Sequence, residues 1–542
     1  MNEVKRFNLL CDSWIPVKTK YGELKTIKAS EVVQQEIIAI DAPRADFNAA
    51  LMQFLIGLLQ TVYAPESPRA WRSLYAQPPS EKELQEKFKD IQNAFYLDGD
   101  DRRFMQDSSI KGNGNKTNIL KLIPGIVGEN TIDKNQDFFI KSSQISGMSL
   151  PNVILGLYLY QNYCLSETGG KNGRHHGSLR GRNTMTVLIT KEDGSLWENL
   201  WLNVIQKKTY KTIIKSGIVN SHFEWMNDKP NEKEKSDNDL NLNDIYWSMP
   251  RRVWINFSEL KDGICDLTAK KTKIVQNIYI KENGIEYKAK LSQHPLIAYS
   301  KDTDGLHAIK IGPEGVNYGD WLSFIGSETA SLNLLEHINR RSLESIFKIF
   351  VCGYLNHPQQ AKTLCWYQTK MPIYPLESEE HRKSLEIEIN KYIQAANKIS
   401  NPRSGYLSIA IRMAWFGYDY DEEKSKNKNK KPDPFYNKAS KALYDHPNEI
   451  AKSFWNNTER RFYESIQRLY DCLNKSTLND EKKVGLRHEW YKFIRDEAIR
   501  LFNRWAFRSG IQNNPKCIAK AYNQLMRNLD SNALNQDVLG LR

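Results

Sequence analysis

The pattern of apolar residues changes near Pro375, and this change limits the fold more than any other feature of the sequence. Beyond it, apolar side chains recur every three to four positions over long stretches, the spacing of amphipathic helices. We expect helices at about 377–398, 404–417, 437–475, 483–508 and 515–530. A chain of 542 residues is also too long for one core. The sequence therefore predicts an α+β fold, with a large mixed α/β domain at 1–375 and a C-terminal helical bundle of the four-helix type at 376–542.

Before Pro375, short strand patterns alternate with helical ones. Apolar residues at Phe47, Leu51, Phe54, Leu55, Leu58 and Val62 predict a helix that ends at Pro65. Further helices are expected at about 67–95 and 151–164, and strands near 7–17, 21–28, 184–190 and 252–257. The segment Y-I-K-E-N-G-I-E-Y-K-A-K predicts a β-hairpin that turns on Asn283-Gly284.

The net charge of the chain favours a polyanionic partner. The sequence carries a formal charge of +13 and has a pI near 9.1, which is typical of proteins that contact nucleic acid. No apolar run approaches the roughly 20 residues that cross a bilayer, and the N-terminus lacks the apolar core of a signal peptide. Seven scattered cysteines predict reduced thiols in a cytoplasmic protein without structural zinc or another cofactor.

The stretch T-G-G-K-N-G-R-H-H-G-S-L-R-G-R-N, Thr168 to Asn183, could cradle a phosphate, hold a metal or contact a nucleic-acid backbone. A phosphate-binding loop lies between a strand and a helix, whereas here the order is helix, loop, strand. Adjacent His175 and His176 cannot easily face one ion, so we expect two exposed loop histidines and no metal site. Glycines let a backbone approach DNA closely, and Lys171 with three arginines supplies charge for phosphates: Arg174, Arg180 and Arg182. These residues favour nucleic-acid contact only slightly over an ordinary surface loop.

No set of catalytic residues is evident in the sequence. The chain has no G-x-S-x-G motif, and the acidic D-G-D-D at 98–101 fits a solvated turn better than a magnesium site. The segment H-E-W-Y-K at 488–492 lacks the second histidine of a zinc-protease helix. We therefore expect a protein that is not an enzyme.

Five segments, in order along the chain, resemble CasA, the large subunit of the type I-E CRISPR Cascade surveillance complex. They are F-N-L-L-C-D-S-W-I-P-V (Phe7–Val17), R-A-D-F-N-A-A-L-M-Q-F-L-I-G-L-L-Q (44–60), F-Y-L-D-G-D-D-R-R-F-M-Q-D (Phe95–Asp107), G-S-L-R-G-R-N-T-M-T (Gly177–Thr186) and G-Y-L-N-H-P-Q-Q-A-K (Gly353–Lys362). The resemblance covers nearly the full length, and the first and third segments carry it most specifically.

This resemblance implies a non-catalytic DNA-recognition subunit. The family reads the protospacer-adjacent motif of a target duplex from the minor groove, helps to open the duplex, and recruits a helicase–nuclease. Further sequence readout belongs to the guide CRISPR RNA, held with the other Cascade subunits.

The resemblance also implies three DNA-binding elements in this chain. The glycine loop aligns at Asn172-Gly173-Arg174, and a basic hairpin aligns at 279–290, where Lys281 and Lys288 are the candidate lysines. A glutamine wedge aligns at Gln359-Gln360-Ala361. A loop that orders on assembly aligns only at Asn135-Gln136, because charged residues replace its apolar tip.

Two other functions stay open at this stage. The chain could be a stand-alone nucleic-acid-processing enzyme with an unrecognised metal site, or a pure assembly scaffold. The sequence does not identify which adjacent motif would be read, since minor-groove recognition depends more on loop geometry than on residue identity.

Overall fold

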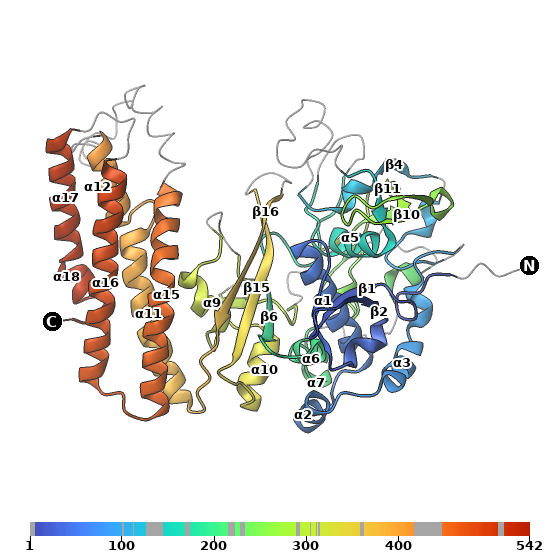
Figure 1. Ribbon diagram of the computed structural model, residues 1–542, viewed down its shortest axis with the longest axis horizontal. Helices are drawn as coiled ribbons and strands as arrows, with labels where there is room; N and C mark the ends of the chain where they lie inside the picture. Colours follow the sequence, from blue (N-terminus) through green and yellow to red (C-terminus); the bar gives the residue numbers. More distant parts are fainter. Residues whose placement is uncertain are drawn as a thin grey trace, which may run out of the picture. The chain divides into compact units, whose positions relative to one another are not determined.

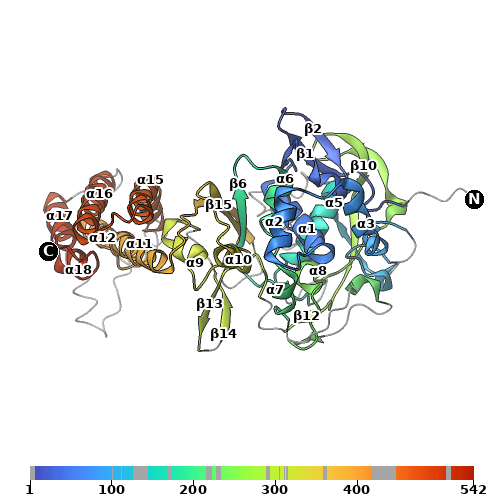
Figure 2. The same cartoon turned by 90° about the horizontal axis from the view of Figure 1, so that it is seen from below.

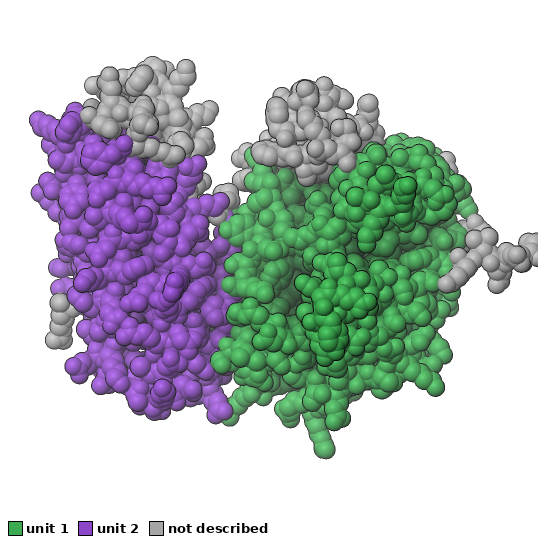
Figure 3. Space-filling model, in the orientation of Figure 1, with its two compact units in different colours: residues 1–313, 327–370 green, residues 314–326, 371–542 purple. Residues whose placement is uncertain are grey.

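The computed structural model describes residues 6–99, 102–111, 113–125, 145–167, 174–214, 223–227, 234–288, 293–303, 305–310, 312, 315–357, 363–416, 447–507 and 514–541. The chain divides into two compact units, coloured separately in Figure 3. Unit 1 comprises residues 1–313 and 327–370, and unit 2 comprises residues 314–326 and 371–542. The predicted α+β fold class, with mixed elements first and long helices last, is confirmed.

Helix α1 (Ala45–Val62) is the centre of unit 1, as its apolar pattern predicts. It packs against α5 (Leu150–Asn162), α6 (Leu196–Trp201) and α8 (Asp244–Trp247) (Figure 1 and Figure 2). The ring of Phe54 meets four aromatic rings edge-on at centroid distances of 5.4–5.8 Å: Trp14, Phe104, Tyr158 and Trp247. Among the described residues α1 is the helix long and apolar enough to cross a membrane, but here that apolar surface is buried in the core of unit 1.

The expected helix at 67–95 is wrong, because two short helices occupy this region. Helix α2 (Pro68–Ala76) ends before Pro78-Pro79, and α3 (Glu81–Lys89) begins after them. The hydroxyl groups of Ser67 and Ser80 cap the two helices by accepting backbone N–H groups. The two prolines interrupt the helical pattern, since proline lacks the N–H that a helix interior needs.

Small antiparallel sheets complete most of unit 1. Strand β1 (Ile15–Thr19) lies between β2 (Leu24–Ile27) and β3 (Ile37–Ile40), and Gly22 forms the turn after β1 with φ of +83°. Strand β15 (Phe347–Asn356) lies between β6 (Thr186–Lys191) and β16 (Thr363–Pro372), with Cys352 opposite Thr186. The other sheets are formed by β4 (Asn115–Asn118), β11 (Asn277–Lys281) and β8 (Arg252–Trp254); by β5 (Met148–Ser149), β10 (Lys271–Val275) and β9 (Lys261–Ile264); and by β13 (Tyr299–Asp302) and β14 (Gly305–Ala308).

Short helices connect these sheets in unit 1. They are α7 (Lys207–Lys211) and α10 (Leu332–Arg340), together with 3₁₀ turns at Ala29–Val33, Gln92–Phe95, Ser108–Ile110, Ile119–Leu122, Glu224–Met226 and Phe257–Glu259. A two-residue parallel pair, β7 (Glu234–Lys235) with β12 (Glu286–Tyr287), lies near the candidate site described below.

Unit 2 is a helical bundle, seen nearly end-on in Figure 2. It contains α11 (Glu379–Ser400), α12 (Tyr406–Phe416), α15 (Pro447–Asn474), α16 (Asp480–Ala506), α17 (Pro515–Leu529) and α18 (Asn532–Asn535). These helices confirm the predicted helical pattern where the structure describes it; residues 437–446 of the expected third helix lie outside the described part. In the core, Tyr392 of α11 stacks on Trp490 of α16 with centroids 5.6 Å apart.

The segment 314–326 belongs to unit 2, although the sequence analysis placed it in the N-terminal domain. It forms a 3₁₀ turn (Tyr318–Asp320) and α9 (Trp321–Ile325). Tyr318 stacks on Phe462 at 4.1 Å and shares a 2.8 Å hydrogen bond with the hydroxyl of Thr458. The C-terminal unit thus includes a segment from the middle of the chain.

Candidate nucleic-acid interface

The base of the glycine-rich stretch is closed by backbone hydrogen bonds. Asn172 and Gly173 lie outside the described residues, but Glu167 and His175 on either side of them pair antiparallel, with two bonds of 2.9 Å. The amide of Ser178 also donates to the carbonyl of Cys164 at 3.0 Å. The two flanks of the expected glycine loop therefore leave the core side by side.

A carboxylate and two cations hold this base. The carboxylate of Glu167 is 3.2 Å from the ammonium of Lys121 and 3.4 Å from the guanidinium of buried Arg251, which also donates to the carbonyl of Leu165. Burial by itself would raise the pKa of Glu167, but Lys121 and Arg251 outweigh it and the net pKa is lowered. Glu167 is thus a charged anchor beneath the loop.

The expectation of two exposed histidines is wrong. His175 is 3% exposed and His176 is 9% exposed. Burial, with the positive charge of Arg251, lowers the pKa of His175 to about 4, and burial also lowers the pKa of His176. Both rings are therefore neutral at pH 7 and belong to the packed base. Among the described residues no group of three His, Cys, Asp or Glu side chains could hold a metal ion.

The expected hairpin at 279–290 is also wrong in its pairing. Strand β11 pairs with β4 and β8, and β12 pairs in parallel with β7, so within the described residues 279–288 the two halves of the segment do not pair with each other. Asn283 has φ of +54°, which suits asparagine, and Gly284 passes so close to Pro250 that a Cβ would lie 2.1 Å from its carbonyl oxygen. The Asn-Gly pair serves a close backbone contact rather than a two-residue turn.

This segment contacts the glycine-rich stretch directly. The amide of Asn283 donates to the carbonyl of Arg174 at 3.0 Å. The carboxylate of Glu286 is 3.5 Å from the guanidinium of Arg174 and 3.8 Å from Nδ1 of His176. Of the two candidate lysines, Lys288 pairs with Glu234 at 2.6 Å, and Lys281 ends β11 opposite Arg252.

A turn at residues 181–183 contacts the strand that precedes the expected glutamine wedge. Gln359, Gln360 and Ala361 lie outside the described residues, between β15 and β16. The side-chain carbonyl of Asn183 accepts the amide of Asn356 at 2.9 Å, and Arg182 donates to the carbonyl of His357 at 2.7 Å. The hydroxyl of Thr363 donates to the side chain of Asn356 at 2.8 Å, which joins the ends of the two strands.

Arg180 has a structural role in place of the expected phosphate contact. Its side chain is buried and donates to Gln53 at 2.6 Å and to Thr186 at 2.7 Å, while the guanidinium lies over the ring of Tyr163. These partners come from α1, β6 and the end of α5, so Arg180 links three core elements. In this structure Arg174 and Arg182, and not Arg180, lie where the glycine-rich stretch meets the other expected DNA-binding segments.

Asn135 and Gln136, in the loop expected to order on assembly, lie outside the described residues. Gly125, the last described residue before them, lies beside β16, because a Cβ added to it would be 3.7 Å from Cγ2 of Thr363. The described chain before this segment therefore ends beside β16, the strand that follows the expected wedge.

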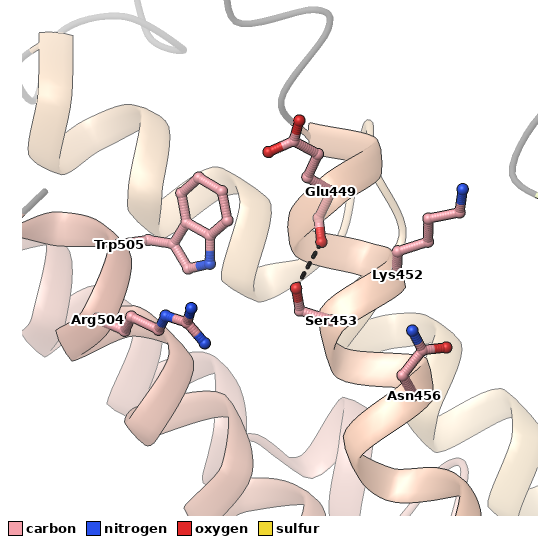
Figure 4. A pocket seen from close by; sticks show the side chains of 6 residues that line it. All are labelled: Glu449, Lys452, Ser453, Asn456, Arg504 and Trp505. Carbon is pink, nitrogen blue, oxygen red and sulfur yellow. Dashed lines mark hydrogen bonds between the residues drawn. The ribbon is translucent and has the colours of Figure 1, made fainter.

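Unit 2 contains a separate hollow of about 430 Å³ between α15 and the end of α16 (Figure 4). The described residues that line it are Glu449, Lys452, Ser453, Asn456, Arg504 and Trp505. This lining has one carboxylate and no histidine or cysteine, so it does not assemble the paired acid and base groups used in general acid–base catalysis.

The contacts that hold the candidate interface together were not predicted from the sequence. Asn183, Asn283 and Glu286 stand in segments quoted above, but those segments do not reveal their partners, and Arg251 belongs to no recognisable motif. The two asparagines carried a usable signal, since both have a positive φ and asparagine tolerates this left-handed conformation. Arg251 and Glu286 contact partners that are distant in sequence, Glu167 and Arg174.

Residues 8–501 match the family described as CRISPR-associated protein Cse1. No curated protein matches the sequence. The fold is similar to that of CasA from Thermus thermophilus, with a TM-score of 0.70, 15% identity, and coverage of 97% of this chain and 99% of that chain. Cse1 from Acidimicrobium ferrooxidans has a TM-score of 0.66 and 15% identity, with coverage of 98% of this chain and 99% of that chain. A chain of a CRISPR RNA-guided surveillance complex has a TM-score of 0.63 and 13% identity, with coverage of 97% of this chain and 100% of that chain.

Proposed function

The chain belongs to the CasA (Cse1) family of type I-E Cascade large subunits, and we propose that it recognises the protospacer-adjacent motif of target double-stranded DNA from the minor groove. It acts without catalysis of its own, helps to start duplex unwinding and R-loop formation, and recruits the helicase–nuclease for antiviral defence. Its partners are the other Cascade subunits, the guide CRISPR RNA and target DNA, in the cytoplasm. The similarity to a chain of an RNA-guided surveillance complex supports this assignment.

One observation carries the proposal: the flanks of the three expected DNA-binding segments are joined by direct hydrogen bonds. Arg174 is bonded to Asn283, which lies between the two candidate lysines. Arg182 and Asn183 are bonded to His357 and Asn356, which precede the glutamine pair. Segments far apart in sequence thus meet in unit 1, as a shared ligand requires.

The chemistry of these segments suits a DNA duplex. Glycine backbone can approach base edges in the narrow minor groove, and Arg174 with the two lysines can position phosphates without reading sequence. A side chain inserted between base steps offsets the loss of stacking, which costs a few kcal/mol per step, and so begins strand separation. Gln359 and Gln360 would have this role.

The test is duplex binding by the whole reconstituted complex across a library of trinucleotides next to the target. We expect a strong preference for a small set of trinucleotides. Gly173→Asp should weaken binding to preferred duplexes by roughly tenfold or more, because a lost minor-groove contact costs about 1–3 kcal/mol. Gln359→Ala with Gln360→Ala should reduce binding to closed duplex but not to duplex already opened beside the motif.

Two results would support the rival functions. Affinity unchanged by Gly173→Asp on every duplex would favour a pure assembly scaffold. Metal-dependent DNA cleavage by the isolated chain, abolished by carboxylate substitutions, would favour a stand-alone enzyme.

A further inference from the structure

Four charged side chains form a compact group where the glycine-rich stretch meets the 281–288 segment. We call Arg174, Glu286, Lys288 and Glu234 the charge quartet. Arg174 pairs with Glu286 at 3.5 Å, and Lys288 pairs with Glu234 at 2.6 Å. Both cations of the quartet, Arg174 and Lys288, are therefore neutralised by carboxylates of the same chain.

The two carboxylates of the quartet are themselves neighbours. Glu286 and Glu234 are register partners in the parallel pair of β12 and β7. Like charges at directly opposed positions destabilise a strand pair, so each carboxylate needs its cation. A phosphate that takes one of the cations leaves its carboxylate facing a second negative charge.

The backbone of the quartet is fixed, so its four residues stay close together. The bond from Asn283 to the carbonyl of Arg174 holds the loop flank against the 281–288 segment. The hydroxyl of Tyr287, between Glu286 and Lys288, accepts the amide of Met249 at 2.9 Å. Lys235, next to Glu234, is buried between the carboxylates of Glu224 and Asp244.

The side chains of the quartet, in contrast, are open to exchange. The exposed fractions are 59% for Arg174 and 30% for Glu286, and 52% for Lys288 and 53% for Glu234. Exposed ion pairs contribute little to stability, so a DNA phosphate can displace either carboxylate once it outweighs the ion pair and the repulsion between Glu286 and Glu234 that follows.

We propose that Glu286 and Glu234 compete with DNA phosphates for Arg174 and Lys288 and thereby limit sequence-independent DNA binding. This inference rests on the proposed function, since it needs this surface to face the duplex. Phosphate contacts carry no sequence information, so an unmasked cation strengthens binding to every duplex, motif or not. The carboxylates lower this background and leave the minor-groove contacts to select the target.

The test compares Glu286→Gln with Glu282→Gln in the whole reconstituted complex, on duplex without a preferred motif. Both changes remove one negative charge from the same segment, but only Glu286 pairs with Arg174. We expect Glu286→Gln to raise the affinity about three- to fivefold, the scale of an exposed ion pair. A plot of log affinity against log salt concentration should also become steeper, by up to about 0.9 in slope, which is the value for one further phosphate contact. Glu282→Gln should stay close to the unaltered complex.

A double-variant cycle separates this competition from a general change of charge. In an Arg174→Ala background, Glu286→Gln should have no effect, because the cation it masks is gone. A gain that persists there, or equal gains for Glu286→Gln and Glu282→Gln, would overturn the proposal. If Arg174→Ala weakens binding but Glu286→Gln changes nothing, only the competition is wrong. If Arg174→Ala leaves binding to all duplexes unchanged, the proposed DNA surface is wrong and the competition with it.

Discussion

Gly284 lies where the 281–288 segment approaches the backbone of Pro250 and Arg251 closely. A Cβ at this position would lie 2.1 Å from the carbonyl oxygen of Pro250 and 3.1 Å from the amide of Arg251. Both neighbours are backbone atoms, which cannot rotate away as a side chain can. The contact fixes the segment that carries Asn283 and Glu286, so this glycine controls the interface without touching a ligand.

Gly284→Ala should therefore destabilise unit 1 locally. Overpacking of this kind costs about 1–3 kcal/mol. We expect faster hydrogen exchange in peptides that cover 248–254 and 277–288 of the full chain. Gly485→Ala is the matched control, because that exposed glycine inside α16 has no atom within 4 Å of an added Cβ. It should stabilise its helix by about 0.5–1 kcal/mol, and equal protection at 277–288 in both variants would contradict the prediction.

Glu388 and Arg487 form the buried ion pair that joins α11 to α16. Arg487 donates to both carboxylate oxygens, at 2.6 and 2.5 Å, and both side chains are largely buried. Burial would raise the pKa of Glu388, but the hydrogen bonds from Arg487 and Lys391 outweigh it and the pKa is lowered. The folded state therefore favours the charged carboxylate.

Loss of this pair should destabilise the bundle and change its response to acid. Because the pKa of Glu388 is lower in the folded than in the unfolded state, its contribution is complete above the unfolded value of about 4.3 and is lost as the pH falls towards the folded value. Glu388→Gln should cost about 3–5 kcal/mol at pH 7, measured by urea dependence of hydrogen exchange in α11 and α16. The stability of the Glu388→Gln variant should also fall less steeply below about pH 4.3 than that of the unaltered chain.

The control for this prediction is Glu379→Gln in the same helix. Glu379 pairs with Lys383 on the exposed surface of α11, so its loss should leave the stability of the bundle unchanged within error. Equal effects of the two substitutions would show that burial of the pair at Glu388 has no special importance.

Among the elements, the turn at 181–183 connects two segments that the resemblance treats as separate. It forms the end of the glycine-rich stretch and is bonded to the end of β15, which precedes the glutamine pair. The placement of one segment therefore depends on the other. The side chain of Asn183 accepts one of the two bonds of this contact, from the amide of Asn356, while its backbone adopts φ of +61°.

Asn183→Gly should weaken strand opening more than motif binding. Glycine tolerates the positive φ, so the substitution removes the bond to Asn356 without straining the turn. We expect opening of closed duplex beside the motif, measured by a fluorescent base analogue, to slow roughly tenfold, since the amide of buried Asn356 loses its partner and such a loss costs about 1–3 kcal/mol. Asn183→Asp keeps the acceptor oxygen and should restore most of the rate.

A second experiment tests whether Asn183→Gly acts through the glutamine pair. If Asn183 acts through Gln359 and Gln360, then Asn183→Gly should cause no further loss when both glutamines are already alanine. An additive loss would mean that Asn183 supports the fold in general and does not place the glutamine pair.

The elements that the sequence predicted are those set by periodic apolar residues. Helix α1 was predicted to run from Phe47 and to end at Pro65, and it is observed at 45–62, because its apolar residues repeat with the helical period. The hairpin at 279–290 was not predictable in the same way. Asn-Gly is a local turn signal, whereas the partners of β11 and β12 come from β4, β8 and β7, far away in sequence.

The burial of single polar residues could not be predicted from the sequence either. His175, His176 and Arg180 stand in a glycine-rich, basic stretch that reads as exposed, yet all three are buried. Their partners, such as Gln53, Arg251 and Glu286, are more than 70 residues away in sequence. The resemblance proposes where the site lies, but the contacts between its segments required the tertiary structure.

For the molecule as a whole, the sequence separated a mixed part from a helical part but missed the segment 314–326. Its two short elements resemble the rest of the N-terminal region in composition. Tyr318 nevertheless lies fully buried in unit 2, between Phe462 and Trp455, with centroids at 4.1 and 4.6 Å. The packing of this segment in unit 2 depends on the space that the bundle provides for Tyr318. It therefore leaves no periodic pattern of apolar residues in the sequence.

Tyr318→Ala should therefore destabilise the C-terminal bundle. Removal of a buried aromatic side chain costs about 3–5 kcal/mol. We expect loss of hydrogen-exchange protection in α15 around 454–462, while peptides of α1 in unit 1 keep theirs. Tyr318→Phe keeps the stacked ring and loses only the bond to Thr458, so its effect should be much smaller. Equal effects on α1 and α15 would show that the segment does not belong to the bundle alone.

The course of the chain through its two units has a consequence for proteolysis. The backbone passes from one unit to the other after residues 313, 326 and 370. A single cut near residue 370 therefore cannot release the helical bundle, since the segment 314–326 is still continuous with unit 1 on both sides. A nicked chain should elute as one species in native chromatography and separate into fragments only after denaturation.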